Sequence, residues 1–322
     1  MSGQDTIAVI GAGVIGAAVA WALAREGRRV LLLDRAEPGV AGASFGNAGH
    51  IAAELVQPLP SPGLLFGFWR DLNCFGGALD LPVRRAAHAQ SADGPWFEDS
   101  AHVRDPLESV RALTAAAAAH SAGFRRMDVR ALRPHGEKIE VQSDEPALLV
   151  DAAVVCAGMG TQPLLAPFGL RAPLQAVRGY HVEIPGHAPF LDAPLLYTRE
   201  HVIVTPMSGR LRASSYMEFA PLDAPPDPRK PARLRHRLRA LGYACDADGA
   251  SWMGARPVLP DYLPAIGRAP GEHRLFYATG HQHIGLTIAP ISGELIADLV
   301  AQRSARIPVA AFDLRRFGTH ER

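Results

Sequence analysis

The chain has 322 residues, which is long enough for one large domain or two interlocked ones around a substantial core. Its 33 lysines and arginines nearly balance 32 aspartates and glutamates, so no long-range field exists to collect nucleic acid. Three scattered cysteines (Cys74, Cys156 and Cys245) suit buried thiols in a reducing, cytoplasmic compartment better than a disulfide framework.

The segment from Ile7 to Ala24 is nearly all apolar and about as long as a membrane span. It lacks the basic region that opens a signal peptide, and its glycines form a regular pattern. We therefore expect a soluble protein, or one bound peripherally at a membrane surface.

The first predicted elements are a strand, a tight turn, a helix and a second strand. The β-branched run at 7–10 predicts the first strand, residues 17–25 favour a helix that Gly27 ends, and residues 30–33 predict the second strand. This order is a βαβ unit. From Arg35 to about Gly67 the chain is rich in Gly, Pro and Ala without a clear period, which indicates a long ordered loop.

The turn between the first strand and the helix reads Gly11-Ala12-Gly13-Val14-Ile15-Gly16, a GxGxxG pattern. Its glycines allow the turn, the approach of a pyrophosphate, and the packing of helix on strand, while the helix N-terminus attracts the phosphates. Asp34, at the end of the second strand, can accept a hydrogen bond from a ribose hydroxyl and would repel a 2′-phosphate. Because small residues follow instead of further βα units, the pattern favours FAD over a nicotinamide cofactor.

A capped helix is predicted to begin at Asp105 and Pro106, with Glu108 completing a capping box. Short strands follow in FRRMDVRAL, KIEVQ and ALLV, and residues 151–158 predict a buried strand parallel to the first. Residues 170–220 alternate like antiparallel strands.

A proline-rich break at 221–231 precedes a predicted helix, and the chain ends with a strand in RLFYATG, a glycine-rich loop and a helix from about Pro290 to Ala301. The predicted fold class is therefore α/β, a Rossmann-like FAD-binding domain with an inserted antiparallel-sheet substrate domain of α+β character. We place the FAD-binding domain at 1–85, 105–168 and 253–322, a shortened connection at 86–104, and the substrate domain at 169–252.

Six stretches, in order, resemble the motifs of the FAD-dependent D-amino acid oxidase and dehydrogenase family: VIGAGVIGAAVAWALAREGRRVLLLDR, GASFGNAGHI, VVCAG, VRGYHVEI, GARPVLPDYLPAIGR and GHQHIGLTIAPISGELIADLV. The resemblance covers nearly the whole chain and is closest to the bacterial D-amino acid dehydrogenases, including the branch that acts on hydroxy-D-proline. It implies FAD contacts at Gly11, Gly13, Val14, Ile15, Gly16, Asp34, Arg35, Ser44, Asn47, Ala48, Gly49, Val129 (through its backbone), Ala157, Gly158, Gly280, Gly285, Leu286 and Thr287.

The same resemblance implies that Arg256, in the motif RPxxPD, binds the substrate carboxylate. A guanidinium matches a planar carboxylate bidentately and keeps its charge, although an arginine that only supports the fold is the alternative. The Cα hydrogen would pass as hydride to flavin N5, and the imino acid would then be hydrolysed, or would persist as a cyclic imine from a proline-type substrate. No catalytic triad is required, because the cofactor carries the chemistry.

The histidines of GHQHIG admit several interpretations. A zinc site at His281 and His283 would need a third ligand, and none has motif spacing, so we predict no metal. The resemblance places His283 at the substrate cavity and His50 beside the flavin; each could tune the protonation of the substrate amine or be a plain wall residue. Ser292 and Gly293, in the first turn of the final helix, are expected to help direct amides at the anionic reduced flavin.

Two further features bear on partners. The predicted helix near 229–241 is rich in arginine, which favours a solvated helix packed by its leucines over one that docks to an anionic membrane to deliver electrons to quinone. The resemblance also implies that this chain is shorter than the usual family member, and that the missing residues fall at about 85–94. Three hypotheses follow: a dehydrogenase of D-amino or cyclic D-imino acids, an FAD-holding electron-transfer or binding subunit that relies on partner chains, and a nicotinamide enzyme or another flavin amine oxidase.

Overall fold

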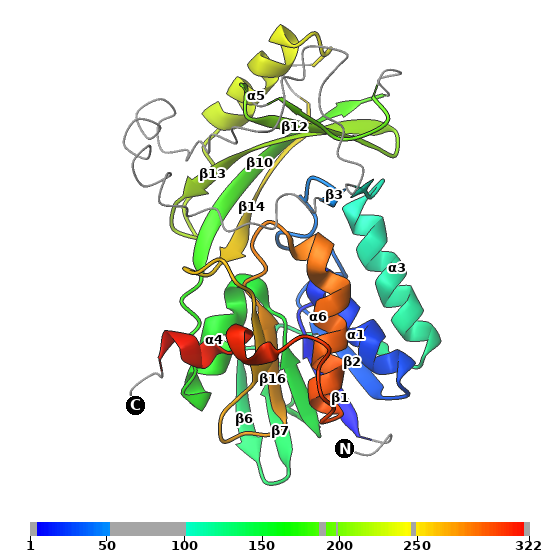
Figure 1. Cartoon of the computed structure of the whole chain (residues 1–322), viewed down its shortest axis with the longest axis vertical. Coiled ribbons are helices and arrows are strands. Elements are labelled where there is room, and N and C mark those ends of the chain that lie inside the picture. Colours follow the sequence, from blue (N-terminus) through cyan, green and yellow to red (C-terminus); the bar gives the residue numbers. More distant parts are fainter. Residues whose placement is uncertain (1–4, 52–100, 187–190, 198, 246–248, 319–322) are drawn as a thin grey trace. The chain divides into compact units, whose positions relative to one another are not determined.

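The computed structural model describes residues 5–51, 101–186, 191–197, 199–245 and 249–318 (Figure 1). The chain divides into two compact units. The first unit contains the described residues up to 45 together with 107–175 and 257–318, and the second contains those of 46–106 and 176–256. The shortfall predicted at 85–94 lies outside the described residues.

A six-stranded sheet, in the order β15-β16-β9-β1-β2-β5, forms the centre of the first unit. Its strands are β1 (Thr6–Ile10), β2 (Arg29–Asp34), β5 (Gly123–Arg126), β9 (Ala152–Val155), β15 (Ala265–Arg268) and β16 (Leu275–Thr279). β1 is parallel to β2 and to β9, and β16 is parallel to β9, whereas β15 pairs antiparallel with β16. The predicted βαβ opening, and the return of the C-terminal part of the chain to the same sheet, are confirmed.

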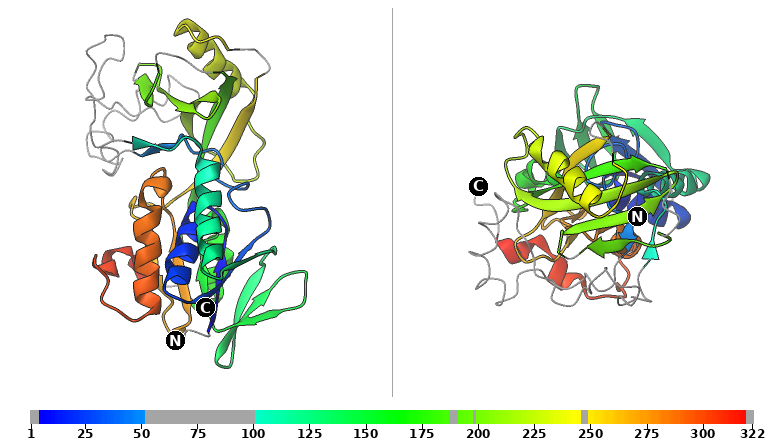
Figure 2. Two further views of the ribbon diagram at one scale, coloured as in Figure 1. Left: turned by 90° about the vertical axis from the view of Figure 1, so that its right-hand side faces the viewer. Right: turned by 90° about the horizontal axis from the view of Figure 1, so that it is seen from above.

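Alternation along β1 determines which elements cover the sheet. Ile7 and Val9 belong to one apolar cluster with residues of α1 (Val14–Arg25) and α6 (Gly285–Val300), while Ala8 and Ile10 belong to another. The two helices lie side by side (Figures 1 and 2). Successive side chains of a strand point to opposite faces, so both faces of the sheet are buried. In the described part of the chain no helix, the apolar α1 included, is long and apolar enough to cross a membrane.

The second face of this sheet is covered by a smaller sheet in the order β6-β7-β8 and by α4, whose apolar residues join Ala8 and Ile10. The remaining bounds in and around the first unit are β6 (Ala131–His135), β7 (Lys138–Gln142), β8 (Leu148–Val150), α3 (Pro106–Ala119), α4 (Thr161–Leu165), η2 (Gly158–Gly160), η3 (Ala166–Phe168), η4 (Val309–Phe312) and η5 (Leu314–Phe317).

The second unit is built on a five-stranded sheet in the order β11-β12-β13-β10-β14. Its elements are β10 (Gln175–Pro185), β11 (Leu195–Tyr197), β12 (Val202–Met207), β13 (Arg210–Phe219), β14 (Ser251–Val258) and α5 (Arg229–Ala240), with a separate pair β3 (His50–Ile51) and β4 (Ala101–His102). β13 pairs antiparallel with both β10 and β12, and β12 pairs antiparallel with β11, as the alternation predicted. Leu234 and Leu238 of α5 enter the apolar cluster of this sheet, so the helix lies across one of its faces (Figure 2).

The final helix begins earlier than we predicted. α6 starts at Gly285 and contains Pro290, and the Ile288 amide already donates to the Ile284 carbonyl at 3.0 Å. A Cβ on Gly293 would lie 2.6 Å from the Ala18 carbonyl oxygen of α1. The expectation that Ser292 and Gly293 occupy the first turn is therefore wrong, because both lie in the middle of the helix and are buried there.

Replacing Gly293 with alanine should destabilise the first unit by about 1–3 kcal/mol, because the new methyl group meets backbone that cannot move aside. Thermal unfolding should show a lower midpoint. Gly160→Ala is the matched control, since in the described part of the chain its Cβ would meet only the Ala157 Cβ, at 3.7 Å. Equal midpoints for the two variants would contradict this account of the α1 and α6 contact.

Candidate functional site

The β1–α1 turn is shaped by close contacts that admit no side chain. Gly11 has φ of +105°, and a Cβ there would lie 2.4 Å from the Cys156 carbonyl oxygen and 3.1 Å from the Ala157 Cα. A Cβ on Gly16 would lie 1.7 Å from the Gly11 carbonyl oxygen. These two glycines are therefore required by the fold itself, and they bring the turn against the residues that follow β9.

Gly13 is different, because among the described residues a Cβ there would meet only the Ser44 Oγ, at 3.1 Å. That hydroxyl accepts a hydrogen bond from the Val14 amide at 3.0 Å. Ser44, Gly13, Val14 and Ile15 thus lie together at the N-terminus of α1. Open space beside a glycine at a helix N-terminus is what the approach of a phosphate needs.

Asp34 ties the ends of the first two strands together. Its carboxylate accepts hydrogen bonds from the Ala12 amide (2.6 Å) and from the Ala36 amide (3.0 Å). Its carbonyl accepts from the Met127 amide at 2.8 Å, which places the segment leading to Val129 beside it. The Arg35 carbonyl accepts from Arg126 Nε at 3.0 Å, while the Arg35 side chain is exposed.

Ala157 and Gly158 follow β9, on the other side of β1. Thr279, at the end of β16, donates through its hydroxyl to the Gly158 carbonyl at 3.4 Å. In the sheet, β2 lies on one side of β1 and β9 lies on its other side, so the strand order reverses at β1. Ligands of open parallel sheets bind at such a reversal, at the carboxyl ends of the strands.

The loop between β16 and α6 completes this edge. Gly280 has φ of +69°, and a Cβ there would lie 2.3 Å from Leu259 Cδ1. Gly285 would place a Cβ 4.0 Å from Ile15 Cδ1, so the N-termini of α1 and α6 are close. The first-turn amides of α6 belong to Gly285, Leu286 and Thr287, and not to Ser292 and Gly293 as we expected.

His281 is a buried structural residue. Ser292 Oγ donates to the Ile288 carbonyl at 2.8 Å, so His281 Nε2, 3.0 Å from Ser292 Oγ, is the donor of that hydrogen bond. Burial lowers the pKa of His281 to about 3, which keeps the ring neutral. His283 is only half-buried, and its ring is tilted by 55° to that of Tyr262 at 6.2 Å. Among the described residues, no three potential metal ligands are grouped.

Gln282, between these histidines, is a residue that the sequence did not single out. It is 5% exposed and has φ of +55°, and both its side-chain oxygen and its nitrogen are buried without a hydrogen-bond partner in the described part of the chain. A buried amide without partners is costly. Its position at the strand reversal suits a polar group of a bound dinucleotide, and the only signal in the sequence is a polar residue inside a glycine-rich motif.

Asn47, Ala48 and Gly49 belong to the second unit, where buried charges hold the loop that contains them. Arg212, 1% exposed, donates to the Asn47 carbonyl at 2.8 Å and pairs with Glu183 at 2.6 Å. Within the loop, the Gly49 amide donates to the Asn47 side chain at 2.7 Å. Burial alone would raise the pKa of Glu183, but hydrogen bonds and charges from Arg212 and Arg210 hold it below its usual value.

The neighbouring Gly46 is held by two rings. His181 Nδ1 lies 3.3 Å from the Gly46 carbonyl, and its ring stacks on Trp252 at 5.2 Å. A Cβ on Gly46 would lie 1.8 Å from the Trp252 ring, so the loop presses directly on the indole. Burial, followed by the charge of Arg212, lowers the pKa of His181 to about 4.

Arg256 lies on β14 of the second unit and is half-buried. Its NH1 donates to the Tyr216 carbonyl at 3.3 Å, so a backbone acceptor holds the guanidinium while the group keeps its charge. His50, also in the second unit, begins β3 and pairs with His102 of β4.

These features define the class of the first unit. A parallel sheet with a GxGxxG turn, an acidic residue after the second strand and open space at Gly13 is the site of a dinucleotide-binding protein. The family model described as FAD dependent oxidoreductase matches residues 6–71 and 78–299. The chain belongs to this family, and its cofactor is FAD.

Curated relatives extend along nearly the whole chain. A D-amino-acid oxidase of Bradyrhizobium diazoefficiens is 27% identical over 414 residues, covering 97% of this chain and 98% of the relative. A D-amino acid dehydrogenase of Paramagnetospirillum magneticum is 27% identical over 423 residues, covering 98% and 99%. Because these alignments are longer than the 322-residue chain, the relatives carry additional residues inside the matched region.

Solved structures show the same fold. Glycine oxidase from Geobacillus kaustophilus superposes with a TM-score of 0.76 at 24% identity, over 97% of this chain and 99% of that chain. L-proline dehydrogenase from P. horikoshii gives a TM-score of 0.76 at 18% identity, over 98% of each chain. The predicted fold class, an α/β unit with a separate antiparallel sheet, is confirmed.

Replacing Gln282 with methionine should act oppositely on the apoprotein and on cofactor binding. Removing an unpartnered buried amide should stabilise the apoprotein by about 1–3 kcal/mol, whereas loss of an amide that bonds to FAD should weaken FAD binding about tenfold or more. Urea unfolding and flavin fluorescence titration measure the two effects. Gln302→Met is the matched control, because Gln302 has the same φ of +55° but is exposed. An unchanged dissociation constant would contradict the contact.

The neutral His281 makes stability depend on pH. With a folded pKa of about 3, the ring takes up a proton near pH 6.5 only in the unfolded state. Stability should therefore fall as pH drops below 6.5, by up to about 1.4 kcal/mol per pH unit from this group. His281→Gln keeps a donor for Ser292 and should lessen the loss measured by urea unfolding at pH 7 and pH 5. His236→Gln, at an exposed position, should not.

Proposed function

We propose that this chain oxidises D-amino acids, or a cyclic D-imino acid such as hydroxy-D-proline, and that Arg256 binds the substrate carboxylate. The observation that carries the proposal is a charged guanidinium held by the Tyr216 carbonyl, in a family whose curated relatives include a D-amino-acid oxidase and D-amino acid dehydrogenases. Orientation of the substrate by a fixed cation is a large part of what such a protein can contribute.

Bound FAD would supply the acceptor for the two electrons and the hydrogen that leave the substrate Cα, as a hydride to N5. The residues of the β1–α1 turn, Asp34, and the loops after β9 and β16 would hold it. Arg256 would orient the substrate carboxylate. His283 and His50 would either tune the protonation of the substrate amine or only line the substrate cavity. The imino acid formed from a D-amino acid would be hydrolysed by water to a keto acid and ammonia, whereas a proline-type substrate would give a cyclic imine that persists.

The domain roles follow the same assignment. We assign the FAD-binding role, which we predicted for 1–85, 105–168 and 253–322, to the first unit. The substrate-domain role is assigned to the second unit, which contains Arg256 and the sheet predicted for that domain. In the structure the units divide after residues 45, 106, 175 and 256. β14 belongs to the sheet of the second unit, which carries that unit past the predicted boundary at 252.

We propose that the electron acceptor is a quinone or another component of a respiratory chain. The protein would reach this acceptor from the cytoplasm, either as a soluble protein or bound peripherally to the inner membrane. The structure supports the packed interpretation of α5. Most of its basic side chains have partners within the second unit: Arg229 with Asp227, Lys230 with Glu218, Arg235 with the Gly249 carbonyl, Arg237 with the Glu200 carbonyl and Arg239 with the Cys245 carbonyl.

A second candidate is an FAD-holding electron-transfer or binding subunit with little turnover alone. The additional residues that the relatives carry inside the matched region favour it. Anaerobic addition of D-alanine or D-proline to the purified yellow protein separates the two functions. Bleaching supports the enzyme, and a flavin that stays oxidised with every D- and L-amino acid of a panel supports the subunit.

Arg256→Lys should raise the KM for the substrate by about 10- to 100-fold while FAD binding survives, because lysine keeps the charge but loses the bidentate fork. Dye-linked initial rates give KM and kcat, and the visible spectrum reports the flavin. Arg233→Lys is the matched control, since it makes the same change at an exposed position of α5. An unchanged KM would remove Arg256 from the substrate site.

A further inference from the structure

Gly179, in the middle of β10, packs directly against the guanidinium of Arg256. A Cβ on Gly179 would lie 2.4 Å from Arg256 NH2 and 2.6 Å from its Cζ and NH1. Gly179 is not among the glycines with positive φ, so its backbone conformation is open to any residue. The space taken by the guanidinium is therefore the visible reason for a glycine at this position.

A β-bulge lies opposite Gly179. Arg178 pairs with Glu218 and Tyr180 pairs with Ser215, so two residues of β13, Tyr216 and Met217, face the single Gly179. Tyr216 has φ of +71°, a left-handed conformation that is unusual for a bulky residue. Bulges redirect groups beside functional sites, and this one turns the Tyr216 carbonyl to Arg256 NH1 at 3.3 Å.

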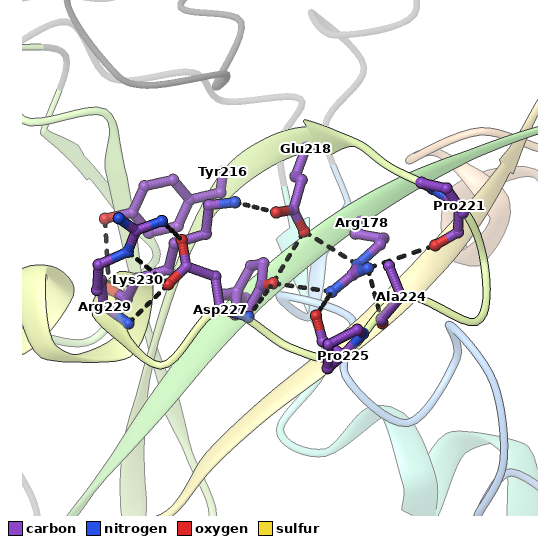
Figure 3. Close-up of polar contacts among 10 residues, drawn as sticks. Arg178, Tyr216, Glu218, Pro221, Ala224, Pro225, Asp227, Arg229 and Lys230 are labelled. Carbon is purple, nitrogen blue, oxygen red and sulfur yellow. Dashed lines mark hydrogen bonds and ion pairs between the residues drawn. The ribbon is translucent and has the colours of Figure 1, made fainter.

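Buried charges hold the bulge. Glu218 accepts from the Tyr180 hydroxyl at 2.8 Å, pairs with Arg178 Nε at 3.0 Å and contacts Lys230 (Figure 3). The Arg178 side chain is 1% exposed and also donates to the carbonyls of Ala224 and Pro225, both at 2.9 Å. Such a cluster is costly to bury unless its geometry is well defined, so it resists movement of β13 beside it.

The Tyr216 side chain is anchored in the same cluster. Its ring meets the Tyr180 ring edge-on, with centroids 5.9 Å apart, and its hydroxyl donates to the Lys230 carbonyl at 3.3 Å. Arg237 lies over the ring at 5.7 Å. With its side chain fixed, Tyr216 keeps the strained backbone that aims its carbonyl at Arg256.

We infer that Gly179 and Tyr216 are positioning residues for substrate binding: together they fix where the Arg256 guanidinium stands. The inference rests on the proposed role of Arg256. Gly179 supplies the space and Tyr216 supplies the acceptor. The cluster of Arg178, Tyr180, Glu218 and Lys230 keeps the bulge in place.

Gly179→Ala tests the inference in the FAD-loaded protein. The atoms that the new methyl group would meet are the mobile end of a side chain, so Arg256 should move while the strand survives. KM for the substrate found in the amino acid panel should rise about tenfold or more, with kcat less affected, because ground-state binding is lost. The unfolding midpoint and the flavin spectrum should stay near those of the parent. Gly123→Ala is the control, because this glycine also lies in a strand and, of the residues that the structure describes, its Cβ would meet only Leu31 Cδ1, at 3.5 Å.

A double-mutant cycle with Arg256→Lys separates positioning from a general structural effect. If Gly179 acts through Arg256, the double variant should have about the KM of Arg256→Lys alone, since effects on one interaction do not add. An additive KM, or a Gly179→Ala variant with the parent KM, would overturn the inference while leaving the role of Arg256 intact. If Arg256→Lys itself leaves KM unchanged, the proposed function fails first and the inference with it.

Tyr216→Asn decides the matter should Gly179→Ala fail to fold. Asparagine tolerates the left-handed conformation and keeps the carbonyl, but it loses the ring that anchors it. A raised KM with a normal flavin spectrum would support the inference, and the parent KM would overturn it.

Discussion

The close packing of Gly11 and Gly16 against neighbouring backbone is the constraint on which the site of the first unit depends. Gly11 and Gly16 allow the β1–α1 turn to fold against the backbone after β9, with no room for even one methyl group. That approach places the N-terminus of α1 at the point where the strand order reverses. The Asp34 carboxylate accepts a hydrogen bond from the Ala12 amide of this turn, which fixes the carboxylate close to the N-terminus of α1.

The second unit uses buried charge where the first uses close packing. Arg212 with Glu183 holds the loop at Asn47, and Arg178 with Glu218 holds the bulge beside Arg256. Buried ion pairs add little net stability, but breaking one leaves an uncompensated charge, so each arrangement has few alternatives. The first pair contacts Asn47 and the second supports the bulge beside Arg256, and we propose that both of these residues bind ligands. A rigid surrounding keeps such residues in place.

Much of this arrangement could be predicted along the chain, and the failures have physical causes. The strands of the parallel sheet and the alternating strands of the second unit follow from periodicity, and α3 begins at Pro106 as its capping signals predict. The start of the final helix was predicted wrongly at Pro290, because proline usually occupies the first turn of a helix. In the structure α6 continues on both sides of Pro290, and Gly293 packs against Ala18. Gly179 was missed, and Gln282 was not singled out within its motif, because their surroundings come from residues distant in sequence.

The sequence by itself determined the class of the protein. The glycine spacing, the acid after the second strand and the six ordered motifs are patterns of residues near one another in the chain, so they can be recognised without knowing the fold. Only the tertiary structure decided which side chains have partners. It showed that His281 is buried and bonded to Ser292, and that most basic residues of α5 have partners within the second unit. It also showed that Gly179 packs against Arg256 and that the carbonyl of Tyr216, in the bulge, accepts a hydrogen bond from it. Partners of this kind are set by folding, because hydrogen bonds and close contacts join residues that the chain keeps far apart.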